Sequence, residues 1–214
     1  MRTFAITGGI GSGKSTVCSF LRDRGIPVYD SDSSAKRLYR EDDSLLDSIE
    51  EAFGCSVRTP EGYPDFRRLA SIVFSFPDKL SVLESLVHPV VLKDFKRWRA
   101  LQATLFEESA RDTSFFGGDP FCVIESAIIL EKPEFLSVVD SVILVDAPLK
   151  DRLLRACERD GTDPAEIVKR MSAQKFDLSK VNYIIRNVGT ESDLQKETEK
   201  VFAEVNGGYS KKNF

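Results

Sequence analysis

A glycine-rich stretch near the N-terminus constrains the fold of this chain more than any other feature of its sequence. Residues 8–16 read Gly-Gly-Ile-Gly-Ser-Gly-Lys-Ser-Thr, which fits the phosphate-loop pattern G-x-x-x-x-G-K-[ST]. The apolar run at residues 2–7 predicts a buried strand before the loop, and the apolar spacing in residues 15–24 predicts a helix after it. This strand–loop–helix order predicts an α/β domain with a nucleotide site at the loop.

Each residue type in the loop suits a bound triphosphate. Glycines let the backbone take left-handed turns and approach phosphates without an intervening Cβ. Consecutive N–H groups and the helix N-terminus then form an anion site. Lys14 would reach the β- and γ-phosphates, and the Ser15 hydroxyl would bind Mg²⁺. We therefore expect ATP and Mg²⁺ as cofactors, with nucleotide contacts from Gly11, Ser12, Gly13, Lys14, Ser15 and Thr16. The alternative is a glycine-rich turn that binds nothing.

Composition narrows the remaining classes of function. The 214 residues suit one α/β domain with an insertion, or two small domains. The net charge of −4 argues against a general nucleic-acid or membrane-surface role. Four scattered cysteines and a single histidine argue against a zinc site and indicate a reducing compartment. With no long apolar run and no leader-like start, we expect a cytoplasmic protein without a membrane span.

The order of apolar runs predicts a three-layer fold around a five-stranded parallel sheet. Strands are expected at residues 2–7, 26–29, 121–126, 141–146 and 181–186, and the runs at 121–126 and 141–146 lack the alternation of a half-exposed strand, as buried parallel strands do. Helical spacing in residues 33–118 predicts an inserted helical block, with separate helices ending at Pro77 and at His88-Pro89. The predicted division is a core of residues 1–32, 119–148 and 176–206, a helical insertion of residues 33–118, an arginine-rich lid of residues 149–175 and a polar tail of residues 207–214.

This layout favours a small-molecule kinase over a switch. The guanine signature N-K-x-D is absent, and no Asp is followed three residues later by Gly. In a kinase of this kind the insertion would hold the acceptor, and the lid would close over ATP to exclude water. Arginine suits the developing phosphate charge, since its planar fork grips phosphate oxygens. The candidates are Arg152, Arg155, Arg159 and Arg170, with solvated helix-face charges as the alternative for each.

Three carboxylates follow predicted strands, where ligands bind in open α/β sheets. Asp30 ends the second strand and is our candidate for aligning and deprotonating the acceptor hydroxyl. The alternative is that Asp30 or Asp32 only caps the helix starting near Ser33, and for Asp32 both interpretations stay open. Glu125 ends the third strand and could hold Mg²⁺ through water, or make a buried contact to Lys14 or the loop.

Further segments extend these motifs over almost the whole chain. They are Thr7 to Val17, Asp30-Ser31-Asp32, Arg67-Arg68-Leu69 with Ile72-Val73-Phe74, Leu86-Val87-His88-Pro89, Ile128-Ile129-Leu130-Glu131, Arg155 with Arg159-Asp160, Arg170 to Gln174, and Asn187-Val188-Gly189. In this combination the chain resembles the dephospho-CoA kinase family. The phosphate loop is shared by many families, but its combination with D-x-D, H-P and R-x-x-x-Q is specific. Two departures are Ala127, where the family usually has Pro, and Val181-Asn182, where it usually has Ala-Asp.

The resemblance implies transfer of the ATP γ-phosphoryl group to the ribose 3′-hydroxyl of dephospho-CoA, giving CoA and ADP. It implies that Asp30 is the catalytic base, with Lys14 and Arg155 as further catalytic residues. It also implies nucleotide contacts from Arg159 and Asn187, the latter near the adenine. On the acceptor side it implies Asp32, Arg67, Arg68, His88 and Arg170. For His88, a helix-terminus histidine before Pro89 is an equal alternative.

Two other functions remain as alternatives. A nucleoside or nucleoside-monophosphate kinase would share this layout, and a nucleotide-dependent switch would share the phosphate loop. The expected partner is the small molecule dephospho-CoA, without nucleic acid or membrane, and the expected assembly is a monomer or a weak homo-oligomer.

Overall fold

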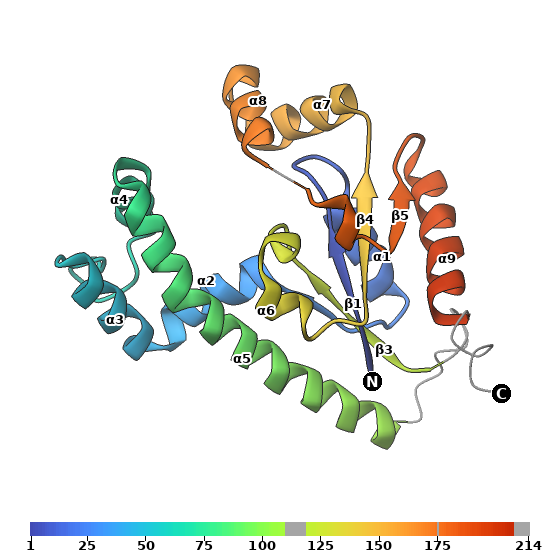
Figure 1. Ribbon diagram of the computed structural model, residues 1–214, viewed down its shortest axis with the longest axis horizontal. Helices are drawn as coiled ribbons and strands as arrows, with labels where there is room; N and C mark the ends of the chain where they lie inside the picture. Colours follow the sequence, from blue (N-terminus) through green and yellow to red (C-terminus); the bar gives the residue numbers. More distant parts are fainter. Residues whose placement is uncertain (110–118, 175, 208–214) are drawn as a thin grey trace. The chain divides into compact units, whose positions relative to one another are not determined.

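A computed structural model describes residues 1–109, 119–174 and 176–207 of the chain (Figure 1). The chain divides into two compact units. The first combines Met1–Tyr29 with Arg99–Phe214, and the second is Asp30–Trp98. The first unit contains the phosphate loop and the sheet that supports it, whereas the second unit is helical.

The sheet is five-stranded and parallel, with the order β2-β3-β1-β4-β5. The strands are β1 (Arg2–Thr7), β2 (Val28–Asp30), β3 (Phe121–Glu125), β4 (Ser141–Asp146) and β5 (Tyr183–Arg186). In the register of β1 with β3, Ile6 is the partner of Glu125. The phosphate loop that follows β1 and the carboxylate that ends β3 therefore lie at the same edge of the sheet.

Burial on both faces explains why the central strands β1, β3 and β4 are mostly apolar, whereas β5 at the edge of the sheet is partly exposed. Phe4, Phe121 and Phe202 are buried together, with the ring centroids of Phe4 and Phe121 5.1 Å apart. The helices α1 (Lys14–Asp23) and α9 (Glu191–Gly207) contribute to the same core. Sheets of parallel strands are normally covered in this way, which leaves no polar face to give alternation.

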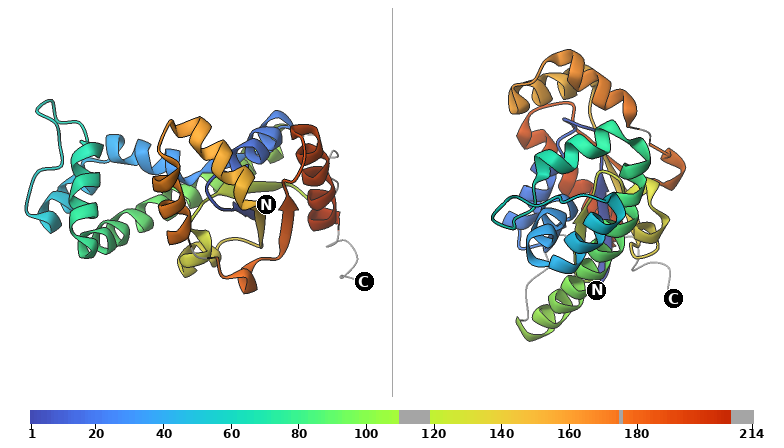
Figure 2. Two further views of the ribbon diagram at one scale, coloured as in Figure 1. Left: turned by 90° about the horizontal axis from the view of Figure 1, so that it is seen from above. Right: turned by 90° about the vertical axis from the view of Figure 1, so that its left-hand side faces the viewer.

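Two helices after β4 form a hairpin with a small core of its own. They are α7 (Leu149–Asp160) and α8 (Pro164–Ala173), and Figures 1 and 2 show them side by side beyond the end of β4. Gly161 ends α7 in the left-handed conformation with φ of 60°, which a glycine adopts without strain. The hairpin core consists of buried Ala156, Ile167 and Met171.

The remaining short elements of the first unit connect its strands. They are the 3₁₀ helix η2 (Ile129–Glu131), α6 (Pro133–Leu136) and the 3₁₀ helix η3 (Leu178–Lys180). Across the described residues, all four cysteines are free thiols, and no helix is both long and apolar enough to cross a membrane.

The second unit contains α2 (Ser31–Glu41), α3 (Asp43–Phe53), α4 (Phe66–Ser75) and most of α5 (Pro77–Ser109). An aspartate caps each of the first three helices through backbone N–H groups of the first turn. The capping residues are Asp30, Asp42 and Asp65. Aspartate is among the most favourable residues at this position, since its carboxylate accepts hydrogen bonds that the helix cannot make internally.

The prediction that one helix ends at His88-Pro89 is wrong, because Pro89 lies inside α5, which Figure 1 shows as one long helix. Proline removes one backbone hydrogen bond, which usually favours a helix end. Here Val87, Val91 and Phe95 are all buried at helical spacing, so the apolar face of α5 continues without a break on both sides of the proline. Tertiary packing thus outweighs the local preference.

The boundaries of β2, β3 and β5 differ from the sequence predictions by one or two residues, whereas those of β1 and β4 are as predicted. The structure begins β2 at Val28 instead of residue 26, ends β3 at Glu125 instead of residue 126, and begins β5 at Tyr183 instead of residue 181. Residues 110–118 of the predicted return loop, residue 175 of the predicted lid and residues 208–214 of the predicted tail lie outside the described residues.

Candidate active site

The phosphate loop has the left-handed backbone that its glycines allow. Gly11 has φ of 73° and Gly13 has φ of 101°, and Gly13 immediately precedes α1. A Cβ at Gly11 would lie 2.1 Å from the backbone oxygen of Arg152, and one at Gly13 would lie 2.4 Å from Nδ2 of Asn187. Glycine is therefore required here both by the backbone conformation and by neighbours from the C-terminal half of the chain.

Replacing Gly11 with Ala is expected to weaken nucleotide binding at least about tenfold, because the new Cβ displaces the backbone of α7 as well as straining the loop. Nucleotide titration with a fluorescent ATP analogue measures this. The matched control is Gly25→Ala, since Gly25 has φ of 76° but open space around a Cβ. If both variants lost nucleotide affinity equally, backbone strain alone would explain the loss.

Lys14 lies folded against the loop that precedes it. Its Nζ donates hydrogen bonds to the carbonyl oxygens of Gly8 at 2.7 Å and Gly9 at 3.3 Å. The ammonium is therefore held within the loop, where a bound phosphate would meet it.

Ser15 and Glu125, the two predicted metal ligands, are in direct contact. The Ser15 hydroxyl donates to Glu125 Oε1 at 3.1 Å, and Arg22 lies 4.0 Å from Glu125 Oε2. A hydroxyl and a carboxylate are hard oxygen donors that suit Mg²⁺, which keeps several waters and takes further ligands from phosphates. No cluster of three or more His, Cys, Asp or Glu side chains occurs within the described ranges, so the residues present fit a phosphate-assisted Mg²⁺ site only. The alternative interpretation of Glu125, a contact to the loop, also matches this geometry.

The four predicted lid arginines fall into two pairs. Arg152 donates from Nε to the Ile10 carbonyl at 3.0 Å, and Arg155 donates to the Gly11 carbonyl and to Asn187 Oδ1, both at 3.4 Å. Burial lowers the pKa of the Arg152 guanidinium, and Asp146 partly opposes that shift. The structure thus brings two of the four arginines to the phosphate loop.

Arg159 and Arg170 instead bind one carboxylate within the hairpin. Asp160 accepts from Arg159 at 2.7 and 3.1 Å and from Arg170 at 2.9 Å. Hydrogen bonds from Arg159 and then Arg170 lower the pKa of Asp160 to about 2. Both guanidinium groups are exposed, and they bind Asp160 instead of the loop.

A cavity of about 230 Å³ adjoins the loop at the start of α1. Its lining residues are Gly13, Thr16, Arg155, Asn187, Gly189, Glu191 and Leu194. Asn187 is only 5% exposed, and its Nδ2 donates to the Ser12 carbonyl at 2.8 Å. The N-x-G segment therefore both lines the cavity and fixes the loop beside it.

In the helical unit, the capping residue of α2 is Asp30. Asp30 Oδ1 accepts from the N–H groups of Asp32 at 3.0 Å and Ser33 at 2.9 Å, and Oδ2 accepts from the Ser33 hydroxyl at 2.7 Å. The alternative that Asp32 caps a helix starting near Ser33 is wrong, because α2 begins at Ser31 and Asp32 is an exposed residue within its first turn. Both Asp30 oxygens remain in an exposed environment, so capping does not occupy all of their acceptor capacity.

The other predicted acceptor-side residues lie on two further helices of this unit. Arg67 and Arg68 are exposed in the first turn of α4. His88 lies inside α5, so the alternative of a helix-terminus histidine is wrong.

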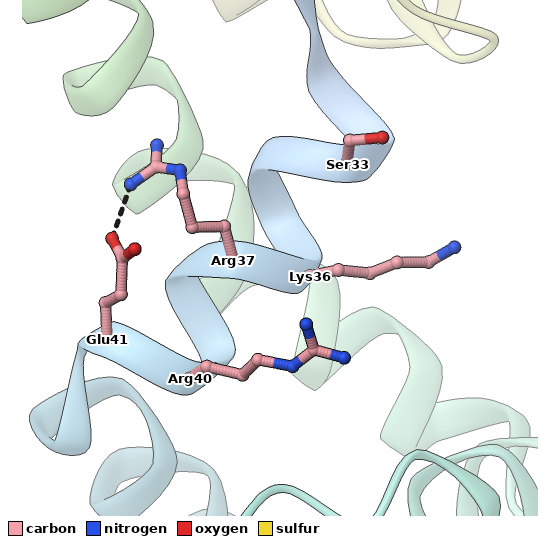
Figure 3. A pocket seen from close by; sticks show the side chains of 5 residues that line it. All are labelled: Ser33, Lys36, Arg37, Arg40 and Glu41. Atoms are coloured by element: carbon pink, nitrogen blue, oxygen red, sulfur yellow. Dashed lines mark hydrogen bonds and ion pairs between the residues drawn. The ribbon is translucent and has the colours of Figure 1, made fainter.

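Sequence reasoning missed a cationic pocket on α2, of about 340 Å³ (Figure 3). Its lining residues are Ser33, Lys36, Arg37, Arg40 and Glu41. Arg37 is paired with Glu41 at 2.6 Å and with Asp94 at 2.5 Å, whereas Lys36 and Arg40 extend to the side on which Ser33 lies. The spacing of Lys36 and Arg40, one helical turn apart and close after Asp30, was the available signal.

Sequence reasoning also missed the role of Gln174. Its Oε1 accepts from the Ile10 N–H at 2.8 Å, so a side chain that follows α8 contacts the phosphate loop. The signal lay in the R-x-x-x-Q segment, which ends at this residue.

Comparison with known proteins shows similarity to dephospho-CoA kinases over most of the chain. The family model described as dephospho-CoA kinase matches residues 2–193. A dephospho-CoA kinase of Porphyromonas gingivalis is 40% identical over 179 residues, covering 84% of this chain and 80% of the relative. One from Thermus thermophilus is 34% identical over 208 residues, covering 95% of this chain and 91% of the relative.

Solved structures show the same fold. A crystal structure of a Thermus thermophilus protein has a TM-score of 0.70 at 30% identity, with 95% of this chain and 97% of that chain covered. A dephospho-CoA kinase structure from Campylobacter jejuni has a TM-score of 0.67 at 22% identity, with 98% and 100% covered.

Proposed function

Since the chain belongs to the dephospho-CoA kinase family, which phosphorylates dephospho-CoA with ATP in coenzyme A biosynthesis, we propose that the phosphate loop, Asp30 and the arginines of α7 carry this reaction. The observation that supports the assignment most strongly is the convergence of four polar side chains on the loop: Lys14, Ser15, Arg155 and Asn187. Lys14 and Ser15 belong to the loop itself, whereas Arg155 and Asn187 lie 144 and 175 residues away from the loop residues that they contact.

The proposed step is an in-line displacement at the γ-phosphorus. The acceptor 3′-hydroxyl oxygen forms a bond to phosphorus while the bond from phosphorus to the β–γ bridging oxygen breaks. The hydroxyl proton passes to the Asp30 carboxylate, and ADP leaves with the electron pair of the broken bond. Such transfers need mainly alignment and charge stabilisation, because negative charge develops on the phosphoryl oxygens.

Residues at the loop are suited to stabilise that charge. Lys14 and the N–H groups of residues 11–16 would hold the phosphates, with Arg155 and Arg152 beside them. Ser15 and Glu125 would hold Mg²⁺, whose chemistry is to neutralise phosphate charge. The cavity lined by Asn187 and Gly189 would take the adenine.

Asp30 is our proposed base because of its place in the chain. It is the last residue of β2, and ligands of parallel sheets bind outside the carboxyl ends of strands. Its side chain is anchored by three hydrogen bonds within the first turn of α2, which fixes the carboxylate without burying it. A fixed, ionised acceptor is what alignment of a hydroxyl requires.

The cationic pocket on α2 has a charge complementary to that of the acceptor. Dephospho-CoA carries a diphosphate, and Lys36 and Arg40 follow Asp30 along the same helix. The α-helix rises about 1.5 Å per residue, so Lys36 lies about 9 Å from Asp30 along the axis, within reach of a diphosphate attached to the same ribose. We propose that Lys36 and Arg40 bind the diphosphate. Further contacts to other parts of the acceptor are proposed for Asp32, Arg67, Arg68, His88 and Arg170.

Replacing Lys36 and Arg40 together with Gln is expected to raise the KM for dephospho-CoA at least about tenfold with little change in kcat, since two charge-assisted contacts are lost. Steady-state kinetics with dephospho-CoA and with adenosine measures this. Adenosine lacks the diphosphate, so its KM should not change.

The control is Lys96→Gln with Arg97→Gln, the same change in charge at exposed positions of α5. An equal rise in KM for adenosine, or an equal effect of the control, would exclude a diphosphate contact at Lys36 and Arg40.

Mass spectrometry of dephospho-CoA incubated with ATP, Mg²⁺ and this protein tests the proposal directly. The expected product is heavier by one phosphoryl group at the 3′ position. Phosphorylation of a nucleoside or nucleoside monophosphate at a higher kcat/KM would instead support the alternative kinase.

A further inference from the structure

One residue of the phosphate loop, Ile10, is held by the α7–α8 hairpin at three points. Its N–H donates to Gln174 Oε1 at 2.8 Å, just after α8. Its carbonyl accepts from Arg152 Nε at 3.0 Å, in the first turn of α7. Its side chain packs against the core of the hairpin, which contains buried Ile167 and Met171. The hairpin thus contacts both polar backbone groups and the side chain of the same residue.

The two neighbours of Ile10 show how closely the hairpin approaches the loop. A Cβ at Gly9 would lie 1.9 Å from a guanidinium nitrogen of Arg152, and one at Gly11 would lie 2.1 Å from the Arg152 backbone oxygen. Arg155 adds a hydrogen bond to the Gly11 carbonyl at 3.4 Å. Glycines 9 and 11 therefore make room for the hairpin as well as for a nucleotide.

We infer that Ile10 is the positioning residue through which the hairpin and the phosphate loop constrain each other. Ile10 lies inside the turn that the Ser12 N–H closes by donating to the Gly9 carbonyl at 3.1 Å, so a constraint on Ile10 is a constraint on this turn. When the hairpin contacts Ile10, the loop backbone adopts the conformation that binds phosphates. When bound phosphates order the loop, its contacts through Ile10 stabilise the closed position of the hairpin. This inference rests on the proposed function and adds the means by which nucleotide binding closes the site.

The physical basis is the reciprocity of coupled equilibria. If hairpin closure favours nucleotide binding, nucleotide binding favours closure by the same factor. Because the Ile10 side chain is apolar, it keeps its place only while the hairpin core covers it, so opening the hairpin exposes Ile10 to water. A closed hairpin also excludes water, which would otherwise accept the phosphoryl group.

Hydrogen exchange with ADP as the probe tests the coupling without any acceptor. In the wild-type protein, ADP should slow amide exchange in both the phosphate loop and α7. In Ile10→Ala the slowing should persist in the loop but fall at least about tenfold in α7. Ile10→Val, which keeps most of the contact, should restore the wild-type pattern. Wild-type protection of α7 in Ile10→Ala would overturn the inference.

Turnover gives the second readout. Ile10→Ala should form at least about three times more ADP per phosphorylated product than wild type, because water enters an unclosed site. Leu154→Ala is the control, since it removes the same number of side-chain carbons as Ile10→Ala. Leu154 lies in α7 and is 58% exposed. If Ile10→Ala does not fold, Gln174→Leu removes only the acceptor of the Ile10 N–H and should shift both readouts in the same direction. Unchanged readouts in Gln174→Leu would then contradict the inference.

The two claims fail differently. If dephospho-CoA is not phosphorylated, the proposed function fails, and the exchange experiment with ADP still decides the role of Ile10. If phosphorylation proceeds and Ile10→Ala behaves as wild type in both readouts, only the inference fails.

Discussion

Asp30→Asn is expected to lower kcat by about 10²- to 10⁴-fold, the usual contribution of a general base, while the protein folds and binds ATP normally. Asn keeps a side-chain oxygen that can accept from the Asp32 and Ser33 N–H groups, and it is as good a helix cap as Asp. It cannot take a proton from the acceptor hydroxyl. The variant therefore separates the role of Asp30 as the cap of α2 from its proposed role as the catalytic base.

Measurement of kcat, ATP binding and the thermal midpoint decides between those roles. Asp30→Ala, which removes the cap as well, should lose about 1 kcal/mol of stability in addition to activity. Asp43→Asn, at an exposed position in the first turn of α3, controls for loss of one negative charge. Near-normal turnover in Asp30→Asn would leave Asp30 as a helix cap only.

Lys14→Met is expected to reduce kcat/KM for ATP by about 10³-fold, the upper range for loss of one group that stabilises transition-state charge. Met keeps an unbranched side chain about as long as the alkyl part of Lys and removes the ammonium. The carbonyl groups of Gly8 and Gly9 also lose a donor, so the loop should become less ordered.

Initial-rate kinetics over a range of ATP concentrations measures this effect. Lys14→Arg keeps the positive charge but not the compact ammonium, so it should recover only part of the activity. Lys200→Met, at an exposed position of α9, tests the general effect of losing one lysine. A Lys14→Met variant within tenfold of wild type would show that the loop amides and arginines suffice.

The fold and the loop could be predicted because their signals are local. A strand, the phosphate-loop pattern with its fixed spacing and a helix follow one another within the first 24 residues. The α7–α8 hairpin and the burial of the central strands β1, β3 and β4 likewise follow from short patterns. The family resemblance added the identity of the reaction, which the phosphate loop alone does not give.

What could not be predicted depends on contacts between distant residues. Asn187 and Ser12 are 175 residues apart, and nothing in either segment specifies the hydrogen bond between them. The passage of α5 through Pro89 depends on packing around Val87 and Val91, which outweighs the local preference of proline. The R-x-x-x-Q motif marks Gln174, but it does not specify the contact with Ile10, which only the folded hairpin creates.

The central position of β1 has a consequence for synthesis. β1 is made first, yet its two neighbours in the sheet, β3 and β4, begin at Phe121 and Ser141. During translation the emerging phosphate loop has no sheet to support it until more than half of the polypeptide has left the ribosome. Pairing of such distant segments is slow, so nucleotide binding should be acquired late in biogenesis, and nascent chains ending before β4 should lack it.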